Sequence, residues 1–169
     1  MDIASELMES MLVKLKSERK WTLQAIEQLS DEDICWSPNP ESNSIANLAA
    51  HIRGGVHSRI ETIFFNIPDT RDRDKEFARG LQMTAEQAAL MIKEAFDILI
   101  QYLEYIKAKP ELLLTRPFLD RPPLTYSQVN NETTVLNLLL AMFREIHTHT
   151  GQIIYAAKAR KGKLTWKYD

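Results

Sequence analysis

Hydrophobic residues recur at helical spacing in four stretches of the chain that contain no proline. Proline inside a helix removes a backbone hydrogen bond and clashes with the preceding turn, so prolines mark where helices end. All seven prolines lie in the connections between residues 1–30, 44–66, 84–107 and 134–160. Each stretch has the length of a helix, and the pattern predicts an all-α protein.

The stretch 84–107 has the clearest helical signature. Thr84 and Gln87 match a capping box, in which two side chains satisfy each other's backbone N–H groups at the start of a helix. The apolar positions after it alternate steps of four and three residues, as expected for a helix face packed on a core. These positions are Ala88, Ile92, Ala95, Leu99, Tyr102 and Ile106. A comparable stripe in the first stretch comprises Leu7, Met11, Leu15, Ile26 and Leu29.

The connections are polar and rich in turn-forming residues. SPNPESNS precedes the second stretch, so Ser42 or Ser44 is expected to cap that helix. The segment NIPDTRDRDKEFARG alternates arginine with aspartate and is interpreted as a solvated loop. The connection 109–133 contains LLLTRPFL and PLTYSQV, each suited to a short strand, so a small hairpin there is an open alternative.

Four helices with one long crossover connection describe a four-helix bundle. A chain of 169 residues is long enough to bury one sizeable core, so residues 1–169 are expected to form a single domain. We therefore expect any functional site to be built from side chains on facing helices.

Composition narrows the classes of partner. A net charge of −2 and a pI near 6.1 provide no strongly basic surface, so neither nucleic acid nor a membrane is an expected partner. No apolar run of about 18 residues is present, and the first residues lack the pattern of a signal peptide, which favours a cytoplasmic protein. The single cysteine, Cys35, has no partner for an internal disulfide and is interpreted as a small apolar filler.

The last stretch places polar chemistry on an apolar seam. The seam, with steps of three and four residues, runs through Val135, Leu138, Met142, Glu145, His149, Gln152 and Ala156. Glu145 and His149 are one turn apart, so their side chains point within about 40° of each other. His147 is rotated by roughly 200° from Glu145 and is expected on another face.

A carboxylate and an imidazole in a core need compensation, and two kinds are open. The first is a mutual hydrogen bond between Glu145 and His149, with help from Gln152 and a water. The second is a metal ion that takes a further ligand from another helix. His51, on the flank of the second stretch, is a candidate for that ligand, although its position equally suits a half-exposed histidine. His57 projects elsewhere and is interpreted as a surface histidine.

Three of the five glycines lie inside predicted helices near these residues. Glycine in a helix interior is less favourable than alanine by about 1 kcal/mol. Gly54 and Gly55 follow His51 by three and four residues, which leaves room for a substrate or for a close backbone approach. Gly151, near His149, suits close helix packing as the simpler explanation.

Three segments together resemble the DinB-like superfamily, in one of its uncharacterised branches. They are WSPNPESNSIANLAAHI at 36–52, RDRDKEF at 71–77 and TVLNLLLAMFREIHTHTGQIIYAAK at 134–158. The N-S-I-A-N-L-x-x-H and H-x-G-Q-I patterns are specific in combination. The resemblance implies a four-helix bundle of the DinB-like type, in which one histidine on the second helix and an HxxxH pair on the last helix hold a divalent ion, commonly zinc or nickel.

Carried onto this chain, the resemblance implies His51 and His149 as metal ligands, with Glu145 at the position of the first histidine of the pair. Glutamate is a competent oxygen donor, so two histidines and one carboxylate would also suit iron or manganese. The carboxylate lowers the charge of the site and would weaken the acidification of a bound water or thiol. His147 is an alternative third ligand that helix geometry disfavours, and Gln152 is expected to hold a ligand or a metal-bound water.

The leading hypothesis is a divalent-metal-dependent enzyme, either a thiol-dependent transferase or a hydrolase. Its cation would act as a Lewis acid on water or on a low-molecular-weight thiol, toward a small-molecule substrate. Characterised members of the DinB-like superfamily include transferases and isomerases that use bacillithiol, mycothiol or glutathione, and metal hydrolases. The resemblance also implies a homodimer. The alternative is a non-catalytic metal-binding or dimeric helical interaction module, in which Glu145 and His149 are structural.

Overall fold

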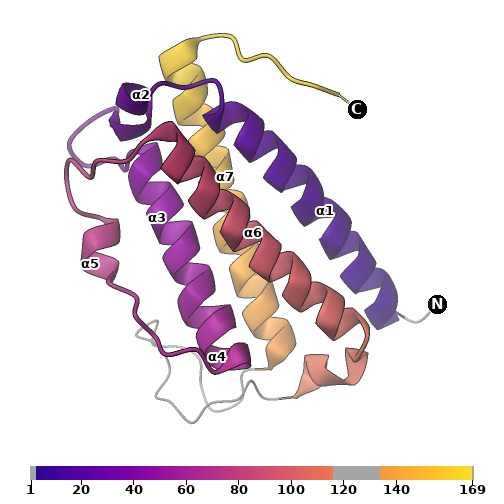
Figure 1. Ribbon diagram of the computed structural model, residues 1–169. Coiled ribbons are helices and arrows are strands. Elements are labelled where there is room, and N and C mark those ends of the chain that lie inside the picture. The colour runs from indigo at the N-terminus through magenta and orange to yellow at the C-terminus, as the bar shows by residue number, and fades with distance from the viewer. Residues whose placement is uncertain (1–2, 116–133, 169) are drawn as a thin grey trace.

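The computed structural model describes residues 3–115 and 134–168, and within these every regular element is helical (Figure 1). The all-α prediction is confirmed for this part of the chain. The elements in order are α1 (Ile3–Ile26), α2 (Asp31–Cys35), α3 (Ile45–Val56), the π-helical turn η1 (His57–Glu61), α4 (Thr62–Phe65), α5 (Arg73–Glu76), α6 (Ala85–Lys107), the 3-10 turn η2 (Pro110–Leu114) and α7 (Val135–Lys161).

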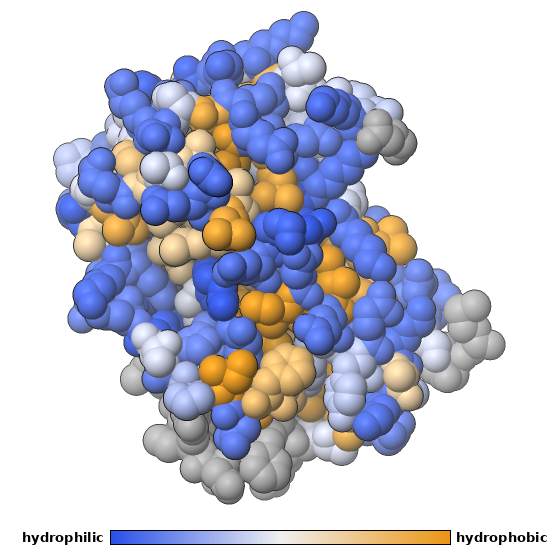
Figure 2. Space-filling model, in the orientation of Figure 1, coloured by the Kyte–Doolittle hydropathy of each residue, from blue (hydrophilic) through white to orange (hydrophobic). Residues whose placement is uncertain are grey.

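Four long helical segments run alongside one another around a shared core (Figure 1). They are α1, α6, α7, and α3 continued by η1 and α4. Helix α6 packs between α1 and α3, and α7 contacts the same two helices. Charged and polar side chains cover most of the face in Figure 2, with apolar groups visible between them. The candidate residues on α3 and α7 therefore lie on helices that contact each other.

The helix starts follow the predicted caps. Ser44 Oγ accepts a hydrogen bond from Asn47 N at 3.2 Å, and Asn47 Oδ1 accepts one from Ser44 N at 3.1 Å, so Ser44 rather than Ser42 caps α3. Thr84 and Gln87 form the same reciprocal pair at the start of α6. The predicted seam of α6 is buried at every position, with no more than 1 % exposure.

Two short helices interrupt connections that the sequence left irregular. Helix α1 ends at Ile26, and Ser30 then caps α2. The interpretation of NIPDTRDRDKEFARG as a solvated loop is wrong in its second half, where α5 forms and Glu76 is 6 % exposed. Asn47 Nδ2 ties this segment to α3, because it donates to the backbone oxygens of Glu76 at 2.8 Å and Ala78 at 3.1 Å.

The proposed hairpin falls largely outside the described residues. Pro110–Leu114, which includes the start of LLLTRPFL, forms a 3-10 turn instead of a strand. Thr115 O accepts a hydrogen bond from Val135 N at 3.0 Å, which ties the end of this turn to the start of α7. Among residues 3–115 and 134–168, no helix combines the length and apolar character needed to cross a bilayer.

Replacement of the α3 cap tests this account of the helix start. Ser44→Ala removes the acceptor for Asn47 N and should lower the free energy of unfolding by about 1 kcal/mol. Ser42→Ala, the matched control, should change it by less than about 0.5 kcal/mol. Equilibrium urea denaturation measures both. Equal effects of the two substitutions would contradict the assignment of Ser44 as the cap.

Candidate functional site

His51 on α3 and His149 on α7 face each other across the packed helices. Their ring centroids are 4.9 Å apart, and the ring planes are nearly perpendicular, at 86°. His51 is 5 % exposed, while His149 is half-buried. The half-exposed position considered for His51 is therefore wrong, because the 66–80 segment covers this flank of α3. Phe77, from that segment, packs on the His51 ring with centroids 4.7 Å apart.

A buried ion pair between Glu76 and Arg71 holds the Nδ1 side of the His51 ring. Glu76 Oε2 lies 2.9 Å from His51 Nδ1. Arg71 donates to both oxygens of the same carboxylate, from Nε at 2.6 Å and from Nη2 at 2.7 Å. Burial would raise the pKa of Glu76, but the hydrogen bonds and charges of Arg71 and His51 lower it below the ordinary value of 4.5. An ionised carboxylate only accepts hydrogen bonds, so the Glu76 contact requires the proton on Nδ1, whereas Arg71 Nη2, which only donates, lies 3.1 Å from the same nitrogen and would require its lone pair. The shorter contact, to Glu76 at 2.9 Å, favours a proton on Nδ1 and leaves Nε2 for another partner.

His149 is held in the corresponding way by its own helix. Its Nδ1 lies 2.8 Å from Gln152 Oε1, one turn further along α7. An amide oxygen only accepts, so this contact also directs the proton to Nδ1 and leaves Nε2 available. Gln152 is exposed rather than turned inward, but it contacts the ring that the sequence analysis associated with it. Both histidines thus have one fixed nitrogen and one nitrogen available to a ligand.

Glu145, the third predicted ligand, forms an ion pair with Arg59. Arg59 Nη1 donates to Glu145 Oε2, and Nη2 donates to Oε1 at 3.2 Å, so the contact is bidentate. Burial would raise the pKa of Glu145, yet the Arg59 contacts and the charges of His51 and His149 lower it below 4.5. The carboxylate is therefore ionised and electrostatically close to both histidines, but its partner is a guanidinium. The alternative of a direct bond from Glu145 to His149 is not the pairing observed.

The π-helical turn brings Arg59 to this position. Thr62 N donates to His57 O, an i to i+5 bond that widens the turn. Each residue of a wider turn advances by a smaller angle, so Arg59 stays closer to the His51 face than an α-helix would place it. Arg59 and Glu76, the two residues that most affect the site, were not identified from the sequence.

The three helical glycines have different surroundings. A Cβ at Gly54 would overlap Glu76 Oε1 and come within 2.9 Å of its Cδ, so glycine there permits the carboxylate to reach His51. A Cβ at Gly55 would meet Arg59 Nη1 and Glu145 Oε2 only at 4.0 Å, which leaves space beside that ion pair. Nothing lies within 4 Å of a Cβ at Gly151, so close helix packing does not explain that glycine.

The other two histidines lie outside the site. His147 is on another face of α7, as predicted, with Nε2 3.0 Å from Glu18 Oε2. The interpretation of His57 as a surface residue is wrong, since its side chain is 14 % exposed. The chain at Thr70 folds back over it and donates a backbone hydrogen bond to Nε2 at 3.1 Å, while Nδ1 contacts Glu61 Oε2 at 2.9 Å.

The predicted ligands only partly assemble a metal site. Across the described residues, no group of three or more His, Cys, Asp or Glu side chains is arranged to hold a metal ion. The two imidazoles fit a divalent cation in their chemistry, because a side-chain oxygen on Nδ1 is the usual support of a histidine that binds metal through Nε2. Glu145 fits by charge, but both of its oxygens are paired with Arg59 in the structure.

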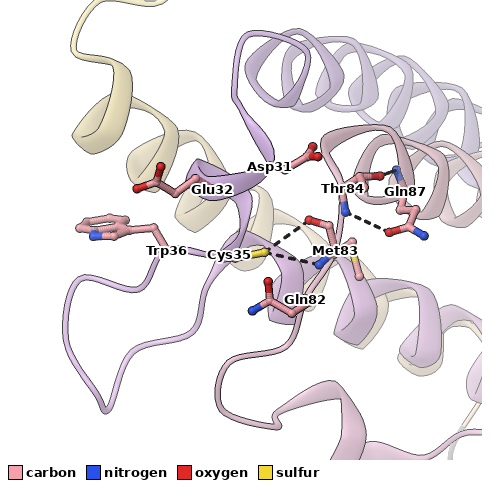
Figure 3. A pocket seen from close by; sticks show the side chains of 8 residues that line it. All are labelled: Asp31, Glu32, Cys35, Trp36, Gln82, Met83, Thr84 and Gln87. Carbon is pink, nitrogen blue, oxygen red and sulfur yellow. Dashed lines mark hydrogen bonds between the residues drawn. The ribbon is translucent and has the colours of Figure 1, made fainter.

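Several pockets of about 480–610 Å³ lie among the described residues, and two of them are lined by residues that the sequence analysis considered. One, of about 560 Å³, lies beside Gln152 and is lined by Leu48, Thr148 and Tyr155 among others. The other, of about 610 Å³, lies between α2 and the start of α6 (Figure 3). There the Cys35 thiol contacts the backbone oxygen and nitrogen of Met83, both at 3.4 Å. The first cavity includes Gln152, which contacts His149, but its lining does not include His51, Glu145 or His149.

Alanine substitutions distinguish the glycines. Gly54→Ala must displace the Glu76 carboxylate and should lower the free energy of unfolding by roughly 1–3 kcal/mol. Gly151→Ala, the matched control, has space for the methyl group and should raise it by roughly 0.5–1 kcal/mol. Urea denaturation of both variants provides the comparison. Stabilisation by both alanines would mean that Glu76 is not held rigidly against His51.

The Glu61 network predicts a dependence of stability on pH. Burial opposes ionisation of Glu61, but hydrogen bonds and charges from Arg53 and His57 lower its pKa below 4.5. This contribution to stability is present above about pH 4.5 and is lost as the pH falls through the lowered folded-state pKa. Glu61→Gln should therefore lose less unfolding free energy than the wild type between about pH 5 and about pH 3.

Urea denaturation at a series of pH values between about pH 5 and about pH 3 measures how steeply the unfolding free energy changes with pH. Glu94→Gln removes a half-exposed partner of the same Arg53 and is the matched control. An unchanged slope in Glu61→Gln would show that the Arg53 and His57 contacts do not lower the pKa of Glu61.

Comparison with known proteins places this fold in a family. The family model described as "Protein of unknown function (DUF1572)" matches residues 2–168. The chain is similar to a solved structure titled "Crystal structure of the conserved protein of locus from Enterococcus faecalis", with a TM-score of 0.66, 17 % identity, and coverage of 96 % of this chain and 99 % of that one. No curated protein matches the chain. Because the family model spans nearly the whole sequence, the chain belongs to the DUF1572 family of proteins of unknown function.

Proposed function

We propose that this protein is a divalent-metal-dependent enzyme that acts on a small molecule, as a thiol-dependent transferase or a hydrolase. His51 and His149 would bind the cation through Nε2, with Glu145 as an oxygen ligand. The proposal includes the four-helix bundle of the DinB-like type that the sequence resembles. Zinc and nickel are the leading metals, and iron and manganese also suit two imidazoles and a carboxylate.

One observation carries the proposal: two imidazoles from different helices contact each other while each Nδ1 is held by a side-chain oxygen. Glu76 lies 2.9 Å from His51 Nδ1, and Gln152 lies 2.8 Å from His149 Nδ1. Two unliganded imidazoles packed against each other gain little from having both orientations fixed. Histidines that bind a metal do gain affinity for it, because a side-chain oxygen on Nδ1 sets the tautomer and increases the basicity of Nε2.

The residues of this chain have distinct roles in the proposed chemistry. A bound cation would supply a Lewis acid for a water or a low-molecular-weight thiol. Glu76, held by Arg71, would keep the proton of His51 on Nδ1, and Gln152 would do the same for His149. Substrate would enter from the cavity of about 560 Å³ beside Gln152.

A second function is favoured by the ion pair between Arg59 and Glu145. Since Arg59 already neutralises that carboxylate, the site is electrostatically complete without a cation, as a non-catalytic helical interaction module requires. In that case the function would reside in self-association or partner binding. Homodimerisation belongs to both proposals and follows from the family resemblance.

Metal content tests the first proposal. Protein purified without nickel columns and then loaded with zinc should hold about one ion per chain. His51→Ala and His149→Ala should lose this occupancy, whereas His147→Ala, on another face of α7, should retain it. Elemental analysis after extensive dialysis measures the ratio. Equal occupancy in all four proteins would contradict the proposed ligands.

Melting with and without a chelator separates the two functions. A cation that binds only the folded state stabilises it, so chelation should lower the melting temperature of the loaded wild type and leave His149→Ala unchanged. The interaction module predicts no change in either protein.

A further inference from the structure

A groove of about 510 Å³ lies between α1, α7 and the C-terminal segment 162–168. Its aromatic side consists of Trp21 from α1, with Trp166 and Tyr168 from the segment. Figure 1 shows the segment leaving the end of α7 and passing the end of α1. None of the three candidate metal ligands lines this groove, so it is a separate site from the proposed metal centre.

Side-chain amides of α1 hold the C-terminal segment in place. Gln28 Oε1 accepts a hydrogen bond from Thr165 N at 2.8 Å, and Gln28 Nε2 donates to Thr165 O at 3.0 Å. One turn earlier, Gln24 Oε1 accepts from Lys167 N at 2.9 Å. Leu164 is buried at 5 % exposure and anchors the start of the segment in the core. The aromatic side of the groove is therefore held by backbone contacts as well as by its own rings.

The three aromatic rings contact one another and leave surface for a ligand. The ring centroids of Trp21 and Trp166 are 5.4 Å apart with the planes at 77°, and those of Trp21 and Tyr168 are 5.2 Å apart at 56°. Trp166 is half-buried and Tyr168 is exposed, so part of their ring surface is accessible. Gly151 lines the groove from α7, and a Cβ there would meet nothing within 4 Å. A planar ring can therefore enter and stack on this side.

The charges along the groove favour an anion. Lys14 and Lys158 line it, and neither ammonium group has a hydrogen-bond or ion-pair partner among the residues that the structure describes. Glu18 also lines the groove, but its carboxylate is engaged by α7. Its Oε1 accepts a hydrogen bond from Thr150 Oγ1, and its buried Oε2 lies 3.0 Å from His147 Nε2.

We propose that this groove binds a planar aromatic anion, whose ring stacks on Trp166 and Tyr168 and whose carboxylate, sulfonate or phosphate group pairs with Lys158. An ammonium group without a partner gains a charge-assisted hydrogen bond from such a group. Aromatic faces stack on a planar ring of either charge, so the lysine supplies the preference for the anion.

Positions along the helices favour Lys158 over Lys14 as the partner. Lys158 follows Ile154, which also lines the groove, by one turn of α7. Lys14 precedes Trp21 by seven residues, or about 10 Å along α1, so only a longer molecule would reach it from the aromatic side. A cationic ligand is disfavoured, because Lys20 Nζ already lies 5.5 Å from the centroid of the Trp21 ring.

Two fluorescent probes with the same rings test the proposal on the full chain. Anilinonaphthalene sulfonate is an aromatic anion, and phenylnaphthylamine is its neutral counterpart without the sulfonate. Fluorescence titration at constant ionic strength measures both affinities. The sulfonate should bind at about one site per chain. It should bind roughly tenfold more tightly than the neutral probe, because only the sulfonate pairs with Lys158.

Matched variants locate the site. Lys158→Met should weaken binding of the sulfonate by roughly tenfold and leave the neutral probe unchanged. Lys161→Met removes the same charge outside the groove and should bind both probes as the wild type does. Trp166→Leu should weaken both probes by roughly fivefold. Trp36→Leu, in the pocket of Figure 3, is its control and should weaken neither.

A further variant keeps the test independent of the C-terminal segment. Gly151→Leu fills the groove from α7, where the structure has space, and should weaken both probes while melting curves show a folded protein. Equal affinities for the two probes, or a sulfonate affinity that Lys158→Met leaves unchanged, would overturn the anionic ligand. Binding that neither Trp166→Leu nor Gly151→Leu weakens, or no binding of either probe, would overturn the site.

Discussion

The buried ion pair between Glu76 and Arg71 is the interaction on which the site depends. It orients the His51 ring, because the Glu76 carboxylate, held by the Arg71 guanidinium, lies 2.9 Å from Nδ1 and accepts its hydrogen bond. The pair itself depends on Gly54, whose missing side chain leaves room for the carboxylate, and on Asn47, which anchors the backbone of Glu76 to α3. A short helix outside the four long segments thus supplies the carboxylate that holds His51.

Arg59 and Glu145 form a second ion pair with the opposite effect. The first pair prepares an imidazole for a ligand, whereas the second occupies a carboxylate that could be one. It is unfavourable to break a partly buried ion pair on one side alone, so the pairing with Arg59 opposes a move of Glu145 toward the histidines. This balance lets the same geometry support either the enzymatic proposal or the interaction module.

Prolines, helix caps and hydrophobic spacing predicted the long helices. The positions of the side chains around the candidate site depend on tertiary contacts, which the sequence does not reveal. Prolines and caps such as Ser44 act within a few residues, so they can be identified from the sequence alone. Glu76 and Arg71 lie in a charged run that is typical of a solvated loop, and only their approach to α3 reveals their role. The π-helical turn at His57–Glu61 has no comparable local signal, yet it places Arg59 beside Glu145. The pairing of His51 with a histidine on the last helix was expected from the family resemblance, while its supporting carboxylate required the structure.

X-ray absorption spectroscopy of the zinc-loaded protein tests the central claim most directly. The account predicts a first shell of nitrogen and oxygen at about 2.0–2.1 Å, with the outer-shell scattering of two imidazole rings. That scattering should fall to one ring in His149→Ala. A shell of oxygen atoms alone, or a spectrum that His149→Ala leaves unchanged, would contradict the assignment of His51 and His149 as a metal-binding pair.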